Sequence, residues 1–279
     1  MITNPNVKIN LGLNVLRKRE DGFHDLETLF VPYFNISDTL EIVVGDDYSR
    51  TSAAIFGKYA PEMIAQGISE DGKLMITIAR KEGVDWDPLK DLTAKAYYIL
   101  SEEFDMPPVK IFLEKNSPVG AGLGGGSADA AFALKMLNEL CGLELDEARL
   151  AGYASRLGSD CAFFIYNRPM IGEGRGEILS EYPLCLDGYD LQVLTPEGVS
   201  VSTKDAYGGI RPHLPEVPLK EALARPVEEW DGILVNDFEE TVFAKYPELA
   251  AIKRSLYDSG AAYASMSGSG SALFALYKA

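Results

Sequence analysis

The residues from Ser117 to Ala131, SPVGAGLGGGSADAA, bring five glycines and two serines together. Glycine loses more conformational freedom on folding than any other residue, so such a dense run needs a reason. The run follows an expected strand and precedes an expected helix, whose N-terminus carries unpaired N–H groups and a partial positive charge. Because glycines let a polyanion approach that backbone closely, the run predicts a phosphate cradle. A tight turn without a ligand is the alternative.

Two better-known phosphate motifs fit this run poorly. Residues 120–125 match G-x-G-x-x-G literally, but a dinucleotide-binding fold requires a second parallel strand soon after the helix. The sequence instead predicts a second helix over 146–157. The Walker A pattern fails as well, because no Gly-Lys-Ser/Thr closes the loop.

The composition is that of an ordinary globular protein, with 279 residues, 47% of them hydrophobic and 24% charged. A formal net charge of -16 argues against binding to nucleic acid or to an anionic membrane, since both need a basic surface. We therefore expect no nucleic-acid or membrane partner. The N-terminal residues lack a signal-peptide pattern, so we expect a cytoplasmic protein.

The three cysteines, Cys141, Cys161 and Cys185, are far apart in the sequence and only two histidines are present. This spacing does not match a zinc site, so we interpret the thiols as core packing.

Mixed strands and helices are expected throughout. Residues 7–15 alternate apolar and polar side chains, which predicts a strand with one buried face and puts Lys8 and Asn10 on the same face. The other expected strands are TLEIVV (39–44), PPVKIFLEK (107–115), CAFFIY (161–166), DLQVLTP (190–196) and the strand–loop–strand segment 261–277. The expected helices cover 88–103, 128–140, 146–157, about 219–224, and 238–258.

Three segments together resemble the GHMP kinases. PVGAGLGGGSADAA is similar to the second motif of that family, and SMSGSGSALFA, from Ser265 to Ala275, is similar to its third motif, a glycine-rich loop that lies near the second. The N-terminal KINLGLNVLRKREDGFHDLETLF resembles the first motif of one subfamily, the 4-diphosphocytidyl-2-C-methyl-D-erythritol kinases of the non-mevalonate isoprenoid pathway. Five local matches carry that subfamily resemblance: DGFH (21–24), GLGGGSADAA (122–131), LGSDCAFF (157–164), PEGVSVST (196–203) and NDFE (236–239).

The resemblance implies a two-lobed α+β fold. Residues 1–158 would form an N-terminal lobe like ribosomal protein S5, which carries the ATP phosphate loop, and residues 159–279 a ferredoxin-like C-terminal lobe. It also implies transfer of the terminal phosphoryl group of ATP, with Mg²⁺, to the 2-hydroxyl of the cytidine substrate, by a monomer or weak homodimer. A GHMP kinase for another alcohol such as homoserine, or a non-catalytic sensor on the same fold, remains open.

The resemblance assigns the chemistry to Asp160 and Lys8. Asp160 would accept the hydroxyl proton, and Lys8 would keep it ionised and polarise the attacking oxygen. The simpler interpretations are a helix-flanking or capping carboxylate for Asp160 and a solvent-facing strand residue for Lys8.

The phosphate cradle is assigned by the same resemblance. Its expected ATP contacts are Pro118, Gly120, Gly122, Leu123, Gly124, Gly125, Gly126, Ser127 and Ala128. Ser127 is also the candidate magnesium ligand. Asp91 and Lys95, with Thr93, are candidates for the adenine pocket, and a surface helix explains them equally well.

The substrate would meet a third group of residues. The resemblance implies hydrogen bonding by Asn10, contact of His24 with the cytosine ring, and aromatic walls from Phe23 and Tyr207. A solvated turn histidine and core aromatics are the simpler alternatives. Ser267 and Gly268 of the third motif complete the expected substrate contacts.

Overall fold

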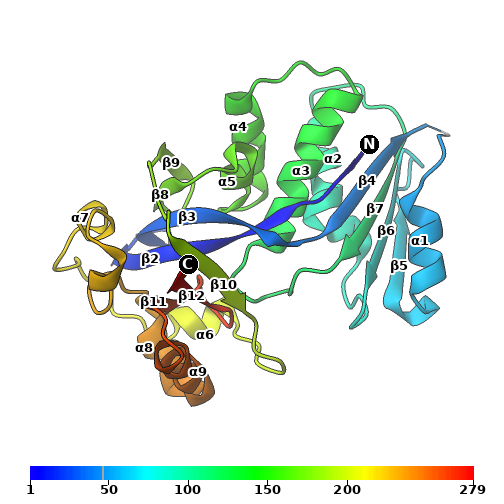
Figure 1. The fold of residues 1–279 in the computed structure, drawn as a ribbon. Helices are drawn as coiled ribbons and strands as arrows, with labels where there is room; N and C mark the ends of the chain where they lie inside the picture. Colours follow the sequence, from blue (N-terminus) through cyan, green and yellow to red (C-terminus); the bar gives the residue numbers. More distant parts are fainter. Residues whose placement is uncertain (46) are drawn as a thin grey trace. The chain divides into compact units, whose positions relative to one another are not determined.

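The computed structural model describes residues 1–45 and 47–279, and the chain divides into two compact units (Figure 1). Unit 1 consists of Met1–Val7, Tyr33–Val119 and Gly124–Asn167, and unit 2 of Lys8–Pro32, Gly120–Leu123 and Arg168–Ala279. Both units mix helices and strands, in agreement with the predicted α+β class. The expected lobe boundary after residue 158 stays a prediction.

A five-stranded sheet forms the frame of unit 1, in the order β1-β4-β7-β6-β5. Its strands are β1 (Ile2–Thr3), β4 (Thr39–Val44), β5 (Ile64–Ile68), β6 (Leu74–Arg80) and β7 (Val109–Lys115). Only the β6–β7 pair is parallel among the described pairs of this sheet. The predicted strands TLEIVV and PPVKIFLEK are confirmed as β4 and β7.

Helices cover both faces of this sheet (Figure 1). On one face lies α1 (Thr51–Lys58), whose Ile55 packs against Val43, Ala79 and Phe112. The opposite face carries α2 (Leu92–Ser101) and α3 (Gly125–Leu140), followed in the chain by α4 (Glu147–Leu157) and α5 (Cys161–Tyr166). Two short 3-10 turns, η1 (Pro61–Met63) and η2 (Pro88–Lys90), complete the regular structure of the unit.

Two predicted helices of unit 1 have different starts in the structure. The helix expected over 88–103 begins only at Leu92, because Asp91 caps it by accepting the Thr93 N–H. The helix expected from 128 begins at Gly125, so two glycines of the run lie in its first turn. The start of α4 is confirmed, with the Asp146 carboxylate accepting the Arg149 N–H.

The prediction of a strand at CAFFIY is wrong, since these residues form α5. A continuous apolar run of six residues has no period that separates a buried helix from a buried strand. Residues 161–165 are all buried, so neither period could appear. The left-handed Asn167, at φ 51°, ends the helix.

Unit 2 contains two sheets. A four-stranded sheet has the order β2-β3-β8-β9, and a three-stranded antiparallel sheet has the order β10-β12-β11. The strands are β2 (Asn6–Lys18) and β3 (His24–Ser37), which both extend into unit 1, then β8 (Met170–Gly174), β9 (Ile178–Glu181), β10 (Tyr189–Leu194), β11 (Tyr263–Met266) and β12 (Leu273–Lys278). The strands expected at 190–196 and within 261–277 are confirmed.

The helices of unit 2 are short. They are α6 (Thr203–Tyr207), α7 (Leu219–Leu223), the 3-10 turn η3 (Val227–Glu229), α8 (Phe238–Lys245) and α9 (Pro247–Asp258). The single helix expected over 238–258 is thus two helices. Tyr246 has non-helical angles before Pro247, because a proline disfavours helical backbone in the preceding residue.

Strand β2 differs from its prediction in burial. Val7, Ile9 and Leu11 are buried as expected, but Lys8 and Asn10 are each only 3% exposed. Both faces of the strand are therefore covered, and the interpretation of Lys8 as a solvent-facing residue is wrong.

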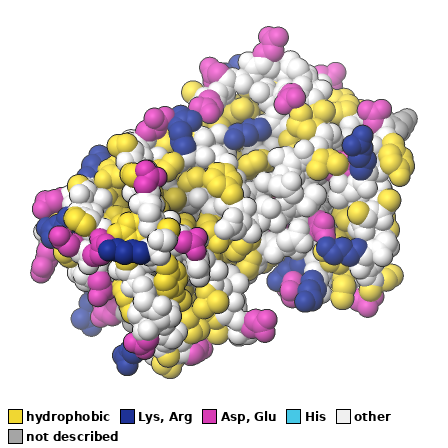
Figure 2. All heavy atoms as spheres, viewed as in Figure 1, with side chains coloured by type: hydrophobic (Ala, Val, Ile, Leu, Met, Phe, Trp, Pro, Cys, Tyr) yellow, Lys and Arg dark blue, Asp and Glu magenta, His cyan; other side chains and the backbone are white. Residues whose placement is uncertain are grey.

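The surface gives few further clues. Acidic and basic side chains are scattered over the face shown in Figure 2 rather than gathered by sign. Within residues 1–45 and 47–279, no helix is both long and apolar enough to cross a membrane. Cys161 is buried and Cys141 half-buried, but Cys185 is exposed, so core packing does not explain that third thiol.

Candidate active site

The N-terminus of α3 presents open backbone in unit 1. Gly124 precedes the helix in the left-handed conformation at φ 72°, and no side chain caps the first turn. A Cβ on Gly126 would meet no atom within 4 Å. The first-turn N–H groups of a long helix and free space above them suit an anion.

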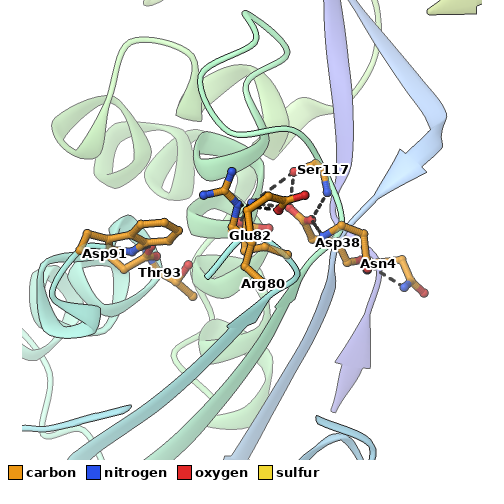
Figure 3. A network of polar contacts seen from close by, with 11 residues as sticks. Asn4, Asp38, Arg80, Glu82, Asp91, Thr93 and Ser117 are labelled. Atoms are coloured by element: carbon orange, nitrogen blue, oxygen red, sulfur yellow. Dashed lines mark hydrogen bonds and ion pairs between the residues drawn. The ribbon is translucent and has the colours of Figure 1, made fainter. Parts of the chain in front are cut away.

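A buried polar network supports this helix start (Figure 3). A Cβ on Gly125 would overlap the Ser117 hydroxyl oxygen and lie 3.5 Å from Lys115 Nζ. Ser117 Oγ donates to Asp38 at 2.6 Å, and Asp38 also accepts the N–H groups of Asn116 and Ser117, each at 2.6 Å. Glycine is therefore required at 125 because the network lies directly beneath the helix.

Lys115 is a buried cation of this network, and it pairs with two carboxylates. It contacts Asp38 and lies 2.6 Å from Asp129, and all three side chains are at most 4% exposed. Burial alone would lower the pKa of Lys115, but Asp129 and Asp38 outweigh it and raise that pKa. Burial and the neighbouring Asp38 raise the pKa of Asp129, against the effect of Lys115. One cation thus compensates two buried acids.

Asp160 stands immediately before α5. It is half-buried and flanks that helix, as the simpler interpretation holds, but its carboxylate forms no capping hydrogen bond with it. Ser127 lies close to the same segment, because a Cβ on Gly158 would be 4.0 Å from Ser127 Oγ. Burial raises the pKa of the Cys161 thiol to about 12, although a hydrogen bond with Ser127 opposes this. The structure therefore brings Ser127 and the LGSDCAFF segment together.

In unit 2, Lys8 makes contacts with the second motif. Its Nζ donates to the Gly122 carbonyl at 2.9 Å and to Asn10 Oδ1, and its own N–H donates to Leu123 O at 3.0 Å. The ammonium also lies 5.5 Å from the centre of the Phe30 ring. A nearly buried ammonium held in this way has a defined position.

The third motif meets the second motif at the same carbonyl, as the resemblance implies. Ser267 Oγ donates to Gly122 O at 3.0 Å and accepts the Asn10 N–H at 3.3 Å. A Cβ on Gly268, at φ 55°, would lie 3.1 Å from Gly122 O and 3.2 Å from Asn10 Oδ1. Gly122 itself has φ 76°, and a Cβ there would clash with the Ser267 carbonyl oxygen. Only glycine fits both crossing points.

The aromatic candidates form two separate groups in unit 2. The His24 ring stacks on Tyr207 with centroids 4.9 Å apart, and Tyr207 also packs edge-on against Phe238. Phe23 is 55% exposed, and the Arg175 guanidinium lies 5.1 Å from its ring centre. Burial, followed by the nearby Lys18, lowers the pKa of His24. Contact of these side chains with a cytosine stays a prediction.

The remaining cradle and adenine candidates are distributed over several environments. Gly120 has φ 74° and open space beside it, Pro118 is half-buried, and Leu123 and Ala128 are buried packing residues. Asp91 is engaged as the cap of α2, and its second oxygen accepts Trp86 Nε1–H at 3.0 Å. Lys95 is exposed. The surface-helix interpretation accounts for Asp91 and Lys95 but not for the third candidate, Thr93, which is fully buried.

Lys8 belongs to unit 2 and Asp160 to unit 1, so their pairing stays a prediction.

The sequence alone did not reveal the residues that support the two glycine loops. Asp129 and Asn236 were present only as letters within the matched segments GLGGGSADAA and NDFE. Asp38 and Lys115 carried no motif signal, although a lysine at the end of an apolar strand could have been noticed.

Comparison with known proteins identifies the family. The description "GHMP kinases N terminal domain" matches residues 91–168, and "GHMP kinases C terminal" matches residues 219–279. Proteins called 4-diphosphocytidyl-2-C-methyl-D-erythritol kinase from Bacteroides fragilis and Bacteroides thetaiotaomicron are each 47% identical, over 99% and 100% of this chain and 92% of their own length.

Solved structures agree with this result. A crystal structure of 4-(cytidine 5'-diphospho)-2C-methyl-D-erythritol kinase superposes with a TM-score of 0.74 at 30% identity, covering 99% of this chain and 90% of that one. A homoserine kinase from Cytophaga hutchinsonii, at 17% identity and a TM-score of 0.65 over 99% of this chain and 86% of its own, shares the fold. With its two glycine loops, its buried Lys8 and these full-length similarities, the chain belongs to the GHMP kinase family and, within it, to the 4-diphosphocytidyl-2-C-methyl-D-erythritol kinases.

Proposed function

We propose that this chain transfers the terminal phosphoryl group of ATP to the 2-hydroxyl of 4-diphosphocytidyl-2-C-methyl-D-erythritol. The 47% identity over nearly the whole chain supports this substrate over other alcohols. The observation that carries the chemistry is the buried Lys8 ammonium, bound to Gly122 O and Asn10 Oδ1 beside the third-motif loop. A lysine that is only 3% exposed and bound by polar partners is positioned to interact with a substrate rather than with solvent.

In the proposed reaction, Asp160 accepts the proton of the substrate hydroxyl as the oxygen attacks. Lys8 stabilises the negative charge that develops on that oxygen, and the Asn10 amide orients the substrate. Phosphoryl transfer requires little covalent chemistry from the protein, so positioning and charge stabilisation supply most of the rate enhancement. The half-buried position of Asp160 supports this role.

The N-terminus of α3 suits the ATP phosphates. Its donors are backbone N–H groups, and the empty space at Gly126 allows close approach of an anion. We assign the phosphate contacts to residues 120–128.

A magnesium ion fits the site with few protein ligands. Among the described residues no group of three or more His, Cys, Asp or Glu side chains is arranged to hold a metal. Mg²⁺ commonly uses one or two protein oxygens together with phosphate oxygens, and the Ser127 hydroxyl offers such an oxygen. When bound, the ion neutralises charge on the transferred phosphate group.

The cytidine end of the substrate is assigned to His24, Phe23 and Tyr207. Burial lowers the pKa of His24, which favours the neutral imidazole, and a neutral imidazole offers one donor and one acceptor nitrogen. Such a pair suits the edge of a cytosine ring, and the aromatic rings offer stacking surfaces. Ser267 and Gly268 would contact the substrate from the third motif.

We place the activity in the cytoplasm, in a monomer or weak homodimer acting on a small molecule without nucleic-acid or membrane partners. The net charge of -16 supports the absence of polyanionic partners.

The test is ADP release by the purified protein with ATP and Mg²⁺, measured in parallel with 4-diphosphocytidyl-2-C-methyl-D-erythritol, homoserine and mevalonate. We expect turnover only with the cytidine substrate, and inhibition by CDP that competes with it. Turnover with another alcohol would retain the kinase and discard the cytidine pocket. ATP binding without turnover on any of the three would favour a ligand sensor.

A further inference from the structure

The NDFE segment, Asn236–Glu239, has no role in the proposed chemistry. It lies in unit 2, where residues 235–237 run beside strand β2 through a parallel bridge between Leu13 and Asn236. Leu13 N–H donates to Val235 O at 2.8 Å, and Asp237 N–H donates to Leu13 O at 2.9 Å. The segment is therefore fixed on the strand that carries Lys8 and Asn10.

The Asn236 side chain is 3% exposed, and all of its hydrogen-bonding groups have partners. Its Nδ2 donates to Met266 O at 2.7 Å and to Gly268 O at 2.9 Å, while its Oδ1 accepts the Phe238 N–H at 3.0 Å. The two N–H bonds of one amide thus hold two carbonyls of the third-motif loop, on either side of Ser267.

The two acidic residues of the segment, Asp237 and Glu239, reinforce this attachment. Glu239 Oε1 accepts the Met266 N–H at 2.8 Å and the Ser265 hydroxyl at 3.0 Å, and its Oε2 lies 2.6 Å from Lys253 Nζ. Asp237 Oδ2 accepts the Val15 N–H at 2.6 Å. The segment joins strand β2 on one side to the third-motif loop on the other.

The loop held in this way contacts the residues assigned to the reaction. Ser267 Oγ donates to Gly122 O, the same carbonyl that accepts the Lys8 ammonium. Gly268 lies against Asn10 Oδ1, which also accepts from Lys8. Displacement of the loop would therefore remove a hydrogen bond that helps to locate Gly122 O, the carbonyl that accepts the Lys8 ammonium.

We propose that Asn236 is a positioning residue for the kinase reaction: its amide clamps the Met266 and Gly268 carbonyls, and through Ser267 the clamp sets the place of Gly122 and Lys8. The inference rests on the proposed function for its kinetic consequence. The clamp itself is a property of the free protein and can be measured without substrate.

Asn236→Asp is the sharpest variant, because it keeps the shape and replaces two donors by an acceptor facing two carbonyls. Leaving both carbonyls without donors in a buried site weakens the loop attachment. Asn236→Ala removes the donors without adding repulsion. Asn138→Asp is the matched control: Asn138 lies in unit 1, donates to Leu145 O at 3.0 Å and accepts Leu145 N–H at 2.9 Å.

The first measurement is amide hydrogen exchange over residues 265–271 in the full-length proteins without substrate. We expect exchange there to be at least about ten-fold faster in Asn236→Asp and Asn236→Ala than in wild type and Asn138→Asp. In the same proteins, kcat/KM for the cytidine substrate should fall by about 10- to 100-fold in the two Asn236 variants, with ATP affinity changed less than about two-fold.

The outcomes test the Asn236 clamp and the proposed function independently of each other. Wild-type exchange rates in a folded Asn236 variant would overturn the clamp whatever the kinetics, and faster exchange with unchanged kcat/KM would overturn the positioning role. Failure of both variants to fold would overturn it too, by showing that Asn236 supports the whole unit. If wild type does not turn over the substrate, the proposed function fails, and the exchange result still decides whether the clamp exists.

Discussion

The two glycine loops of this kinase are supported in physically different ways. In unit 1 the start of α3 rests on a buried ionic network, in which Lys115 serves Asp38 and Asp129. In unit 2 the third-motif loop is held by the neutral amide of Asn236, bound to two backbone carbonyls, and next to it Glu239 accepts the Met266 N–H and the Ser265 hydroxyl. An ionic support fails as a whole when one charge is removed, whereas an amide support can be loosened locally.

Each kind of support suits the role that is proposed for its loop. In the proposed function, backbone N–H groups at the start of α3 bind the ATP phosphates, which requires a helix axis that stays fixed. The third-motif loop places Ser267 Oγ 3.0 Å from Gly122 O, and a Cβ on Gly268 would lie 3.1 Å from the same oxygen. A network of charges suits the first requirement and a directional pair of hydrogen bonds suits the second.

Removal of the cation from the ionic network should give the largest effect on stability. Lys115→Met leaves two carboxylates buried without their partner, and we expect the free energy of unfolding to fall by about 3–5 kcal/mol. Urea denaturation measures this change. Lys73→Met is the control, because Lys73 forms an exposed pair with Asp105 at 3.3 Å and should cost less than about 1 kcal/mol. Equal losses in the two variants would show that the network does not support α3.

A methyl group at the crossing of the two loops should damage both stability and activity. In Gly122→Ala the new Cβ meets the Ser267 carbonyl, and the residue must keep φ 76°. We expect the free energy of unfolding to fall by about 1–3 kcal/mol and kcat/KM to fall at least about ten-fold. Parallel urea denaturation and ADP-release assays check both numbers, and full activity would contradict the contact between the motifs.

A methyl group at the open start of α3 should raise the KM for ATP without lowering the stability of the protein. Gly126→Ala meets no atom within 4 Å, so the free energy of unfolding should stay the same or rise by up to about 1 kcal/mol. The KM for ATP should rise by about five-fold or more, because the methyl group occupies the approach of the phosphates. Gly57→Ala in α1, equally unobstructed, is the matched control with unchanged KM. Equal ATP kinetics in both variants would remove Gly126 from the cradle.

Much of the fold followed from local patterns. Strand β2 was predictable from its alternation and the start of α4 from the Asp146 cap, because both signals are local. The helix at CAFFIY and the break before Pro247 were missed, the first because six apolar residues show no period and the second because the apolar pattern continues across the proline.

The candidate site was predictable only in part. The glycines of both loops were recognisable in the sequence, because a positive φ and a close approach of two backbones both require glycine. The burial of Lys8 and the clamp of Asn236 were not predictable, because they depend on contacts between segments far apart in the chain. Lys8 and Gly122 are 114 residues apart, and Asn236 and Gly268 are 32 apart.

The central claim is that this chain moves the terminal phosphoryl group of ATP onto the cytidine substrate, with Asp160 as the base. Its most direct test is single-turnover transfer of a labelled γ-phosphoryl group to 4-diphosphocytidyl-2-C-methyl-D-erythritol by wild type and Asp160→Asn, with ATP binding measured alongside. We predict labelled 2-phosphate product from wild type, and transfer slower by roughly two or more orders of magnitude in the variant with ATP affinity nearly unchanged. Equal transfer rates in the two proteins would contradict the assignment of Asp160, and no labelled product from wild type would contradict the function.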